Sequence, residues 1–418
     1  MTMKRIILYA ALLSLMFACH KLDYTHNNEG DIEKNNYICE LIQRAEMLRE
    51  EGGLTKGAPV RVDTEHIYYL TSTDTKSSTA DTLVVVLNFQ NYGGFAILPY
   101  KSDIAEYIAV TNLGFYDGTP TDIEAFNIYV DQICRHISEY KIKNAYVVNE
   151  SFSKTITTKA TNTRRVNPLI PVSWHQDAPF NWYCSNPYNS SVPAGCVAVA
   201  IAQSMTVAKY PATIDLTYPG ATSSSVSLDW DQMLGHNSYC DRSCLICQMK
   251  AHLLREIGER VDMEYGVGGS SANTLNFAKS CLTSFGFTCS DHTDFNIQRI
   301  ENSLNAGYPV IVRAQNQDSS SGHAWNIDGY EYAGNVRYQK ELGTGMIIGS
   351  STTETWYTNF KYGWGGINDG RYLSYQKITG TGSYAANGDV AVYVSVPLFT
   401  DTNGLNYSVR IFTDIRPI

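Results

Sequence analysis

The sequence predicts an α+β protein built from two globular domains. Its 418 residues are enough for two domains, each with a full hydrophobic core. In the second half, patterns typical of helices come first and patterns typical of strands follow. Residues 151–166 are rich in Ser, Thr, Lys and Asn and lack a periodic apolar pattern. We therefore expect a first domain over residues 20–150, a linker over 151–166 and a second domain over 167–418.

The first domain is expected to be a small α+β unit. Apolar residues recur at close to helical spacing over 36–50, which predicts a short helix. Strand patterns follow at 67–70, 82–89 and 93–99, and residues 91–94 form the turn between the last two. A helix and a few strands pack most simply as one α+β layer pair.

The second domain is expected to place helices before a sheet. An apolar segment without glycine or proline begins at Cys196, and further helical patterns lie at 253–258 and 273–285. Alternating apolar residues then predict six strands, at 310–314, 324–330, 345–349, 355–362, 371–375 and 389–396. The long stretch between Tyr330 and Trp356 indicates an extended hairpin.

The N-terminus carries an export signal. Lys4 and Arg5 precede an apolar run that ends at Ala18, too short for a membrane span and typical of a signal peptide over residues 1–19. A small residue followed by cysteine is typical of a bacterial lipoprotein signal, so Cys19 would carry a lipid and anchor the protein. The alternative is ordinary cleavage near Ala18 with Cys19 unmodified. We expect an outer-membrane or cell-surface lipoprotein, or a protein secreted after processing.

Charge and cysteine content exclude several classes of partner. The net charge of −9 and the lack of a basic run argue against nucleic acid. Apart from Cys19 and Cys196, eight cysteines form two even subsets, so disulfides are open to an exported protein. These are Cys39 and Cys134, then Cys184, Cys240, Cys244, Cys247, Cys281 and Cys289. Cys240, Cys244 and Cys247 resemble a metal cluster, but no fourth ligand stands at a customary spacing. We expect no metal and no cofactor.

Cys196 is the candidate nucleophile. Pro193 and Gly195 mark a turn, which places Cys196 in the first turn of the predicted helix. Unpaired N–H groups and the helix dipole stabilise a thiolate there. The alternative is a buried structural cysteine that behaves as a small hydrophobe.

Three other segments supply the groups that a thiol nucleophile requires. His323 lies between Gly322 and a strand-like run, where an imidazole would accept the thiol proton. Gln176 lies upstream of the cysteine and offers an amide donor for an oxyanion. Trp364 lies on a glycine-rich turn downstream of the histidine.

In chain order, these motifs resemble the streptopain family of papain-like cysteine peptidases. Flanking matches lie at 228–230, 261–266 and 306–310, and the resemblance covers approximately residues 167–395, with a weaker match before it. It implies a papain-like fold and a cysteine endopeptidase acting on proteins or peptides. By the same resemblance, Cys196 is the nucleophile and His323 the base and later acid. Gln176 would help form the oxyanion hole, and Trp364 would shield the imidazole.

The resemblance also implies a zymogen. Residues 20–150 would form an inhibitory propeptide, with a helix over 122–140, that covers the cleft and holds nucleophile and base apart until cleavage. Processing would fall in the basic linker, which carries Lys154, Lys159, Arg164 and Arg165.

One position departs from the family. The family pattern has asparagine and tryptophan directly before Gly-Trp-Gly-Gly, where this chain has Lys361 and Tyr362. A lysine accepts no proton from the histidine ring, and its charge disfavours an imidazolium. Asn359 is the substitute candidate, either from the same strand face or through a two-residue insertion at a bulge. The departure leaves open a catalytically weak surface protein that binds peptides or host proteins, and acyl transfer to an amine.

Overall fold

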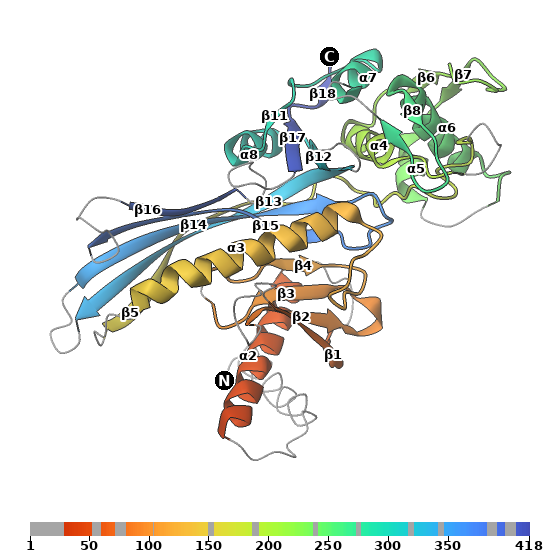
Figure 1. Ribbon diagram of the computed structural model, residues 1–418. Coiled ribbons are helices and arrows are strands. Elements are labelled where there is room, and N and C mark those ends of the chain that lie inside the picture. Colours follow the sequence, from red (N-terminus) through yellow and green to blue (C-terminus); the bar gives the residue numbers. More distant parts are fainter. Residues whose placement is uncertain are drawn as a thin grey trace, which may run out of the picture. The chain divides into compact units, whose positions relative to one another are not determined.

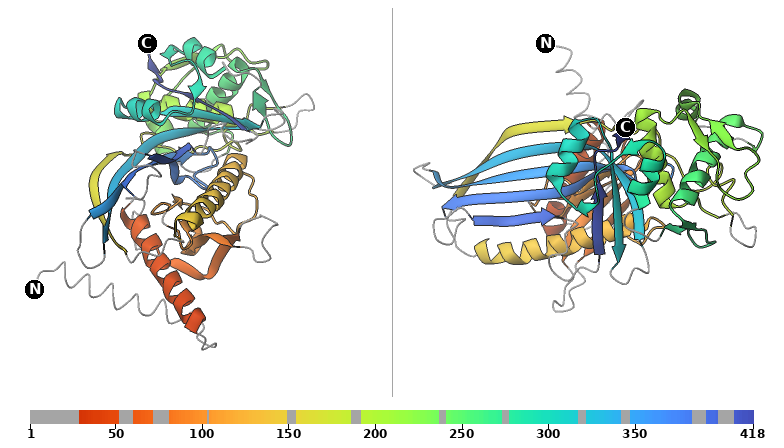
Figure 2. Two further views of the ribbon diagram at one scale, coloured as in Figure 1. Left: turned by 60° about the vertical axis from the view of Figure 1, so that its left-hand side comes forward. Right: turned by 90° about the horizontal axis from the view of Figure 1, so that it is seen from above.

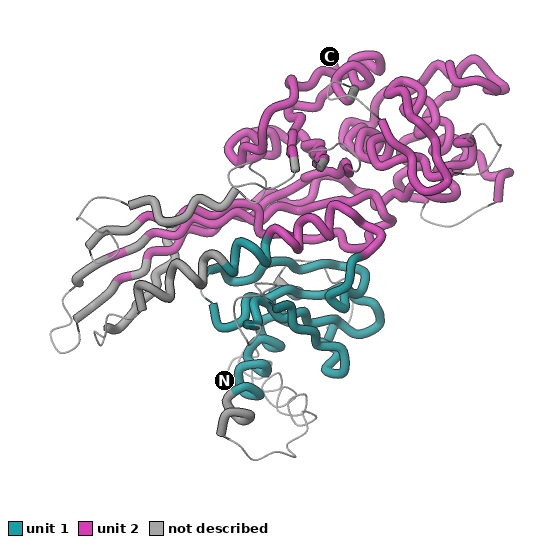
Figure 3. The backbone as a smooth tube through the Cα atoms, in the orientation of Figure 1, with its two compact units in different colours: residues 1–120, 133–146 teal, residues 121–132, 147–418 magenta. Residues whose placement is uncertain are grey.

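The computed structural model describes residues 29–418 apart from eleven short gaps. The gaps are 52–59, 72–80, 103, 149–153, 186–191, 237–240, 273–276, 317–321, 342–346, 383–390 and 398–406. The predicted signal peptide, including Cys19, therefore lies outside the described residues, and so does Cys240. The chain divides into two compact units, residues 1–120 with 133–146 and residues 121–132 with 147–418 (Figure 3).

Unit 1 is a small α+β domain. It contains helix α2, four antiparallel strands and the later part of helix α3. The elements are α2 (Glu29–Glu51), β1 (Val62–Thr71), β2 (Thr82–Phe89), η1 (Gln90–Tyr92), β3 (Phe95–Pro99), β4 (Ala109–Thr111) and α3 (Glu124–Val148). The strands lie in the order β1-β2-β3-β4, and the periodic apolar residues of α2, Ile38, Leu41, Ile42, Ala45 and Leu48, are all buried. The predicted helix over 122–140 is confirmed as α3, which runs further.

The helical part of unit 2 surrounds α4. Its helices are α4 (Cys196–Ala208), α5 (Trp230–Gly235), α6 (Leu245–Arg260), α7 (Phe277–Ser284) and α8 (Ile297–Asn305). Short strand pairs join them: β6 (Thr213–Asp215) with β7 (Ser225–Ser227), β8 (Met263–Glu264) with β9 (Ser271–Ala272), and β10 (Phe287–Thr288) with β18 (Arg416–Pro417).

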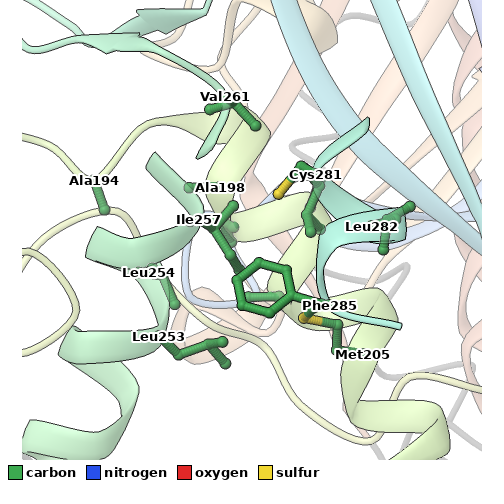
Figure 4. Close-up of a cluster of buried hydrophobic side chains, with 14 of the residues drawn as sticks. Ala194, Ala198, Met205, Leu253, Leu254, Ile257, Val261, Cys281, Leu282 and Phe285 are labelled. Atoms are coloured by element: carbon green, nitrogen blue, oxygen red, sulfur yellow. The ribbon is translucent and has the colours of Figure 1, made fainter. Parts of the chain in front are cut away.

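An apolar core holds α4 in place. Ala198 and Met205 of α4 pack in one cluster with Leu254 of α6 and Leu282 of α7, and Phe285 closes it (Figure 4). All five side chains are buried. Because a closely packed core resists displacement, the N-terminus of α4 is a rigid platform for Cys196.

The antiparallel sheet of unit 2 follows the helices in sequence. Its strands are β11 (Thr293–Asp294), β12 (Val310–Asn316), β13 (Gly322–Glu341), β14 (Ile347–Lys361), β15 (Gly370–Gly382), β16 (Ala391–Pro397) and β17 (Tyr407–Phe412). They lie in the order β15-β14-β13-β12-β17-β11, and β16 pairs with β15. Figures 1 and 2 show the long strands running side by side. The predicted α+β layout and the extended β13–β14 hairpin are confirmed.

The segment expected to be an irregular linker is a strand. β5 (Lys154–Val166) pairs antiparallel with the distal part of β13, from Tyr330↔Val166 to Glu341↔Lys154 (yellow in Figure 1). Its polarity suggested a linker, but threonine and isoleucine are β-branched and favour strands. Arg164 anchors the strand, because its guanidinium pairs with Glu301 (Nε–Oε1 2.9 Å) and lies 4.0 Å from the Tyr332 ring centroid.

Among the described residues, no helix has the length and apolar character needed to cross a membrane.

Candidate active site

Cys196 is the first residue of α4, as the sequence predicts. Gly195 precedes it with φ of 93°, a backbone conformation that side-chain-bearing residues rarely adopt. A Cβ added at Gly195 would also lie 2.7 Å from Cε of Met263. The first helical hydrogen bond runs from Val199 N to Gly195 O (3.1 Å), so the N–H groups before it point out of the helix start.

His323 lies near the start of β13 and faces the thiol. Its strand neighbour Ala324 donates its backbone N–H to Cys196 Sγ (3.4 Å). The imidazole Nε2 donates to the carbonyl of Tyr362 (3.0 Å), because a carbonyl only accepts. Nδ1 is therefore left for Cys196, whose sulfur is hydrogen-bonded to this ring.

The two groups stabilise each other as an ion pair. Burial acts to raise the pKa of the Cys196 thiol, but the charge of His323 and hydrogen bonds from His323, Ala324 and Val197 outweigh it and hold the pKa below its usual value. Burial acts to lower the pKa of His323, yet the Cys196 thiolate, its hydrogen bond, the Tyr362 carbonyl and the charge of Glu124 raise it. The arrangement favours a thiolate–imidazolium pair.

This pairing is present with residues 20–150 still attached. The expectation that the propeptide holds nucleophile and base apart is therefore wrong for this structure, since Cys196 and His323 already share a hydrogen bond.

Three buried thiols in the same unit have pKa values shifted the opposite way. Burial raises the pKa of Cys184 to about 11, of Cys281 to about 12 and of Cys289 to about 11. These three are buried, whereas Cys196 keeps part of its surface accessible. Cys196 is thus more readily ionised and more accessible than these three thiols.

Gln176 lies beside the turn that leads to Cys196. The carbonyl of Gln176 accepts the N–H of Ala194 (2.8 Å), and the residue is buried. This hydrogen bond holds Gln176 beside Ala194, which is two residues before Cys196. Gln176 therefore lies close to the outward-pointing N–H groups at the start of α4. Such donors are what a developing oxyanion requires.

Trp364 packs against the non-helical, non-strand segment that carries Gln176. Its ring meets the His175 ring edge to face at a centroid distance of 5.4 Å, and Gly365 donates its N–H to Trp174 O (3.0 Å). The ring contacts recorded for His323 within the described residues are with Trp325 and Tyr362. The sequence did not single out His175, because its contact arises only when the glycine-rich turn folds over the Gln176 segment.

Asn359 does not reach the catalytic histidine. It pairs with Gly329 in the β13–β14 ladder, and its Nδ2 lies 2.4 Å from where a Cβ on Gly329 would stand. Gly329 is six residues beyond His323 on the same strand, a distance of roughly 20 Å. The prediction that Asn359 orients the ring is wrong, because the β13–β14 register carries it along the sheet.

Lys361 does not present an unbalanced charge to the imidazole. Its Nζ hydrogen-bonds Ser173 Oγ (3.0 Å) and pairs with Asp369 Oδ2 (3.4 Å). The histidine ring is instead met by the backbone carbonyl of Tyr362. The sequence does not indicate this acceptor, because every residue has a backbone carbonyl whatever its side chain.

A second cluster has metal-ligand residue types. His236, Cys244 and Cys247 bring their ligand atoms within 4.8 Å of one another, and Cys244 Sγ lies 3.7 Å from His236 Nε2. Cys247 is disulfide-bonded, so its sulfur is not a thiolate ligand. The two remaining ligands are fewer than a structural zinc site uses.

Known proteins are similar in sequence to this chain over the same motifs. The family model described as "Peptidase C10 family" matches residues 174–372, which include Gln176, Cys196, His323 and Trp364. Streptopain of Streptococcus pyogenes is 23% identical over a match that covers 66% of this chain and 70% of that protein.

Two solved structures from Prevotella intermedia are also similar. A mutant fragment of prointerpain A has a TM-score of 0.46 at 20% identity, covering 73% of this chain and 90% of that chain. Active interpain A has a TM-score of 0.36 at 23% identity, covering 50% and 85%.

The helix-borne thiol and strand-borne imidazole, together with the Peptidase C10 match over the same residues, define a cysteine endopeptidase of α+β fold. Over the motifs that carry these groups, residues 174–372, the chain is similar to the Peptidase C10 family, and over a longer match it is similar to streptopain.

Proposed function

We propose that this protein is an exported cysteine endopeptidase, made as a zymogen, that hydrolyses peptide bonds through an acyl-thioester on Cys196. The observation that carries the proposal is the lowered pKa of the Cys196 thiol beside a His323 whose pKa is raised. A thiolate opposite an imidazolium is the resting state that such catalysis requires.

In the proposed mechanism, the Cys196 thiolate attacks the carbonyl carbon of the scissile peptide. The carbonyl oxygen gains the negative charge and is stabilised by the Cys196 N–H and the side-chain amide of Gln176. Protonated His323 donates its Nδ1 proton to the leaving amine as the C–N bond breaks. His323 then takes a proton from water, the hydroxide attacks the acyl-thioester, and the thiolate leaves.

The Tyr362 carbonyl is proposed to hold the imidazole ring during these steps. Its hydrogen bond with Nε2 fixes the tautomer that keeps Nδ1 toward the thiol. This role takes the place of the family's asparagine, since Lys361 is occupied with Asp369. The paired lysine also removes the main argument for a surface protein that binds without cutting.

Loss of the nucleophile tests the proposal. The purified protein should cleave casein and a denatured protein substrate under reducing conditions, and Cys196→Ala should abolish both. Equal cleavage by the two proteins would overturn the proposal.

Residues 20–150 are proposed to act as a propeptide that inhibits the enzyme until it is removed. The processed bond is proposed to lie N-terminal to β5, so that β5 stays with the mature enzyme. Two observations support this: β5 pairs with β13 within unit 2, and Arg164 is held by Glu301 and Tyr332. A bond inside a paired strand is poorly accessible to a protease.

Intact-mass analysis of the purified protein tests the processing proposal. The mature form should begin before Lys154, while the Cys196→Ala variant stays unprocessed. A mature N-terminus at or after Arg165 would contradict it.

Export and anchoring are proposed from the sequence alone. The apolar run before Ala18-Cys19 supports a lipid on Cys19, and the alternative is secretion after ordinary cleavage. Incorporation of a labelled fatty acid into the wild type but not into Cys19→Ser would support the lipid. Equal labelling of both proteins would exclude it at this residue.

A further inference from the structure

Asp369 makes three polar contacts, one of them to Tyr362, the residue whose carbonyl binds the catalytic histidine. One carboxylate oxygen, Oδ1, accepts the backbone N–H of Tyr362 (2.9 Å). The other, Oδ2, lies 3.4 Å from Lys361 Nζ and 3.3 Å from Ser173 Oγ. The residue is only 5% exposed, so these contacts form in a region that excludes most water.

Tyr362 connects Asp369 to His323 through its own backbone. Its N–H donates to Asp369, and its carbonyl accepts from His323 Nε2 (3.0 Å). Gly363 follows with φ of 76°, and a Cβ there would lie 2.9 Å from Val199 Cγ1 on α4. Tyr362 is thus fixed at its N–H by the Asp369 carboxylate, while the next residue, Gly363, lies against Val199 of the cysteine helix.

We propose that Asp369 is a positioning residue for the catalytic histidine, acting through the Tyr362 backbone, with Lys361 as its charge partner. This inference rests on the proposed cysteine peptidase function and extends its machinery to a residue that touches neither substrate nor thiol. It also gives the departure at Lys361 a role: the lysine supports the group that fixes the carbonyl.

The charge partner is needed because a buried carboxylate is costly when unpaired. Burial raises the pKa of Asp369, and Lys361, Tyr362 N–H and Ser173 oppose that shift. Asp328 of β13 faces the same lysine, and burial raises its pKa to about 7. Asp328 is therefore ionised less readily than an ordinary carboxyl group and competes less with Asp369 for the lysine charge.

Two double variants of equal charge isolate the hydrogen bond to Tyr362. In K361M/D369N the amide oxygen still accepts the Tyr362 N–H, whereas in K361M/D369L a side chain of similar volume accepts nothing. K361M/D369N should keep kcat within about threefold of the wild type. K361M/D369L should lose about a hundredfold in kcat with little change in KM, because misplacement of a catalytic group by about 1 Å costs that much.

A pH readout separates positioning from a merely structural effect. Without a fixed carbonyl, the His323 imidazolium is less stabilised, so the upper limb of the kcat/KM profile should move to lower pH in K361M/D369L only. Equal kcat and equal profiles for the two double variants would overturn the inference. If the leucine variant fails to fold, K361M/D369A provides the same comparison.

Glu301→Gln is the matched control. Glu301 is also 5% exposed and ion-paired, to Arg164, but it contacts Tyr330, about 23 Å along β13 from His323. Its variant should lower the melting temperature without moving the pH profile. Alkylation of Cys196 as a function of pH gives the same readout without a substrate. If the wild type cleaves nothing, the proposed function fails, while the alkylation comparison still decides the role of Asp369.

Discussion

Cys196 and Cys281 occupy the same core yet differ in their chemistry. Both pack in the apolar cluster around α4, and burial acts to raise the thiol pKa of each. At Cys281 the charge of Arg260 opposes burial too weakly, and the pKa rises to about 12. At Cys196, the His323 charge and the surrounding N–H donors reverse the effect. The partners of a thiol, rather than its burial, decide whether it is a nucleophile.

The largest expected effect separates the two cysteines directly. Cys196→Ala should lower kcat by about a millionfold, because removing the nucleophile of a comparable triad costs that much. Cys281→Ala should leave kcat unchanged and cost about 1 kcal/mol of unfolding free energy by opening a small cavity. Peptide hydrolysis and chemical denaturation measure the two quantities. If Cys196→Ala hydrolysed peptides at the wild-type rate, Cys196 would not be the nucleophile and the contrast with Cys281 would fail.

The next largest effect is expected from the loss of a hydrogen-bond donor to the oxyanion. Gln176→Ala should lower kcat about a hundredfold to a thousandfold, the usual cost of one lost oxyanion donor. Alkylation of Cys196 should stay at the wild-type rate, because the thiol pair is untouched. A loss of alkylation rate equal to the loss of kcat would show that Gln176 acts on the thiol instead.

A smaller effect comes from the turn that sets the Cys196 N–H direction. Gly195→Ala forces a side chain into a conformation with φ of 93° and against Met263, at a cost of about 1 to 3 kcal/mol. The strain should shift the start of α4 and lower kcat about tenfold. Gly220→Ala is the matched control, since φ there is 86° and no atom lies within 4 Å of its Cβ. It should lower stability while leaving kcat unchanged.

The smallest effect is expected at Asn359. Asn359→Ala should change kcat less than twofold, because the residue pairs with Gly329 far along β13 from the imidazole. Steady-state kinetics at the pH optimum measures this. A loss of tenfold or more, without loss of folded protein, would return Asn359 to the candidates for orienting the ring.

The sequence was informative where local chemistry and local structure coincide. Gly195 followed by an apolar run predicted the start of a helix, and α4 begins at Cys196. Alternating residues after Pro309 predicted β12 to β15 and the long hairpin, since a strand buried on one face leaves a period of two.

The sequence was uninformative where the deciding contact is nonlocal. The polar composition of β5 concealed a strand that is stabilised by pairing with β13, more than 150 residues away. The group that meets the histidine ring is a backbone carbonyl, so residue type at Tyr362 carries no sign of it. The charge of Lys361 was expected to disfavour the imidazolium, because the sequence does not show that Asp369 forms an ion pair with this lysine.

The pH dependence of Cys196 alkylation tests the central claim most directly. Purified protein is treated with iodoacetamide across pH 5 to 10, and modification of Cys196 is measured by peptide mass spectrometry beside the His323→Ala variant. A lowered thiol pKa means that the thiolate persists below the usual range near 8.5, so the wild type should react quickly at mildly acidic pH. His323→Ala should react only as the pH approaches that of an ordinary thiol. Superimposable profiles for the two proteins would contradict the ion pair and the mechanism built on it.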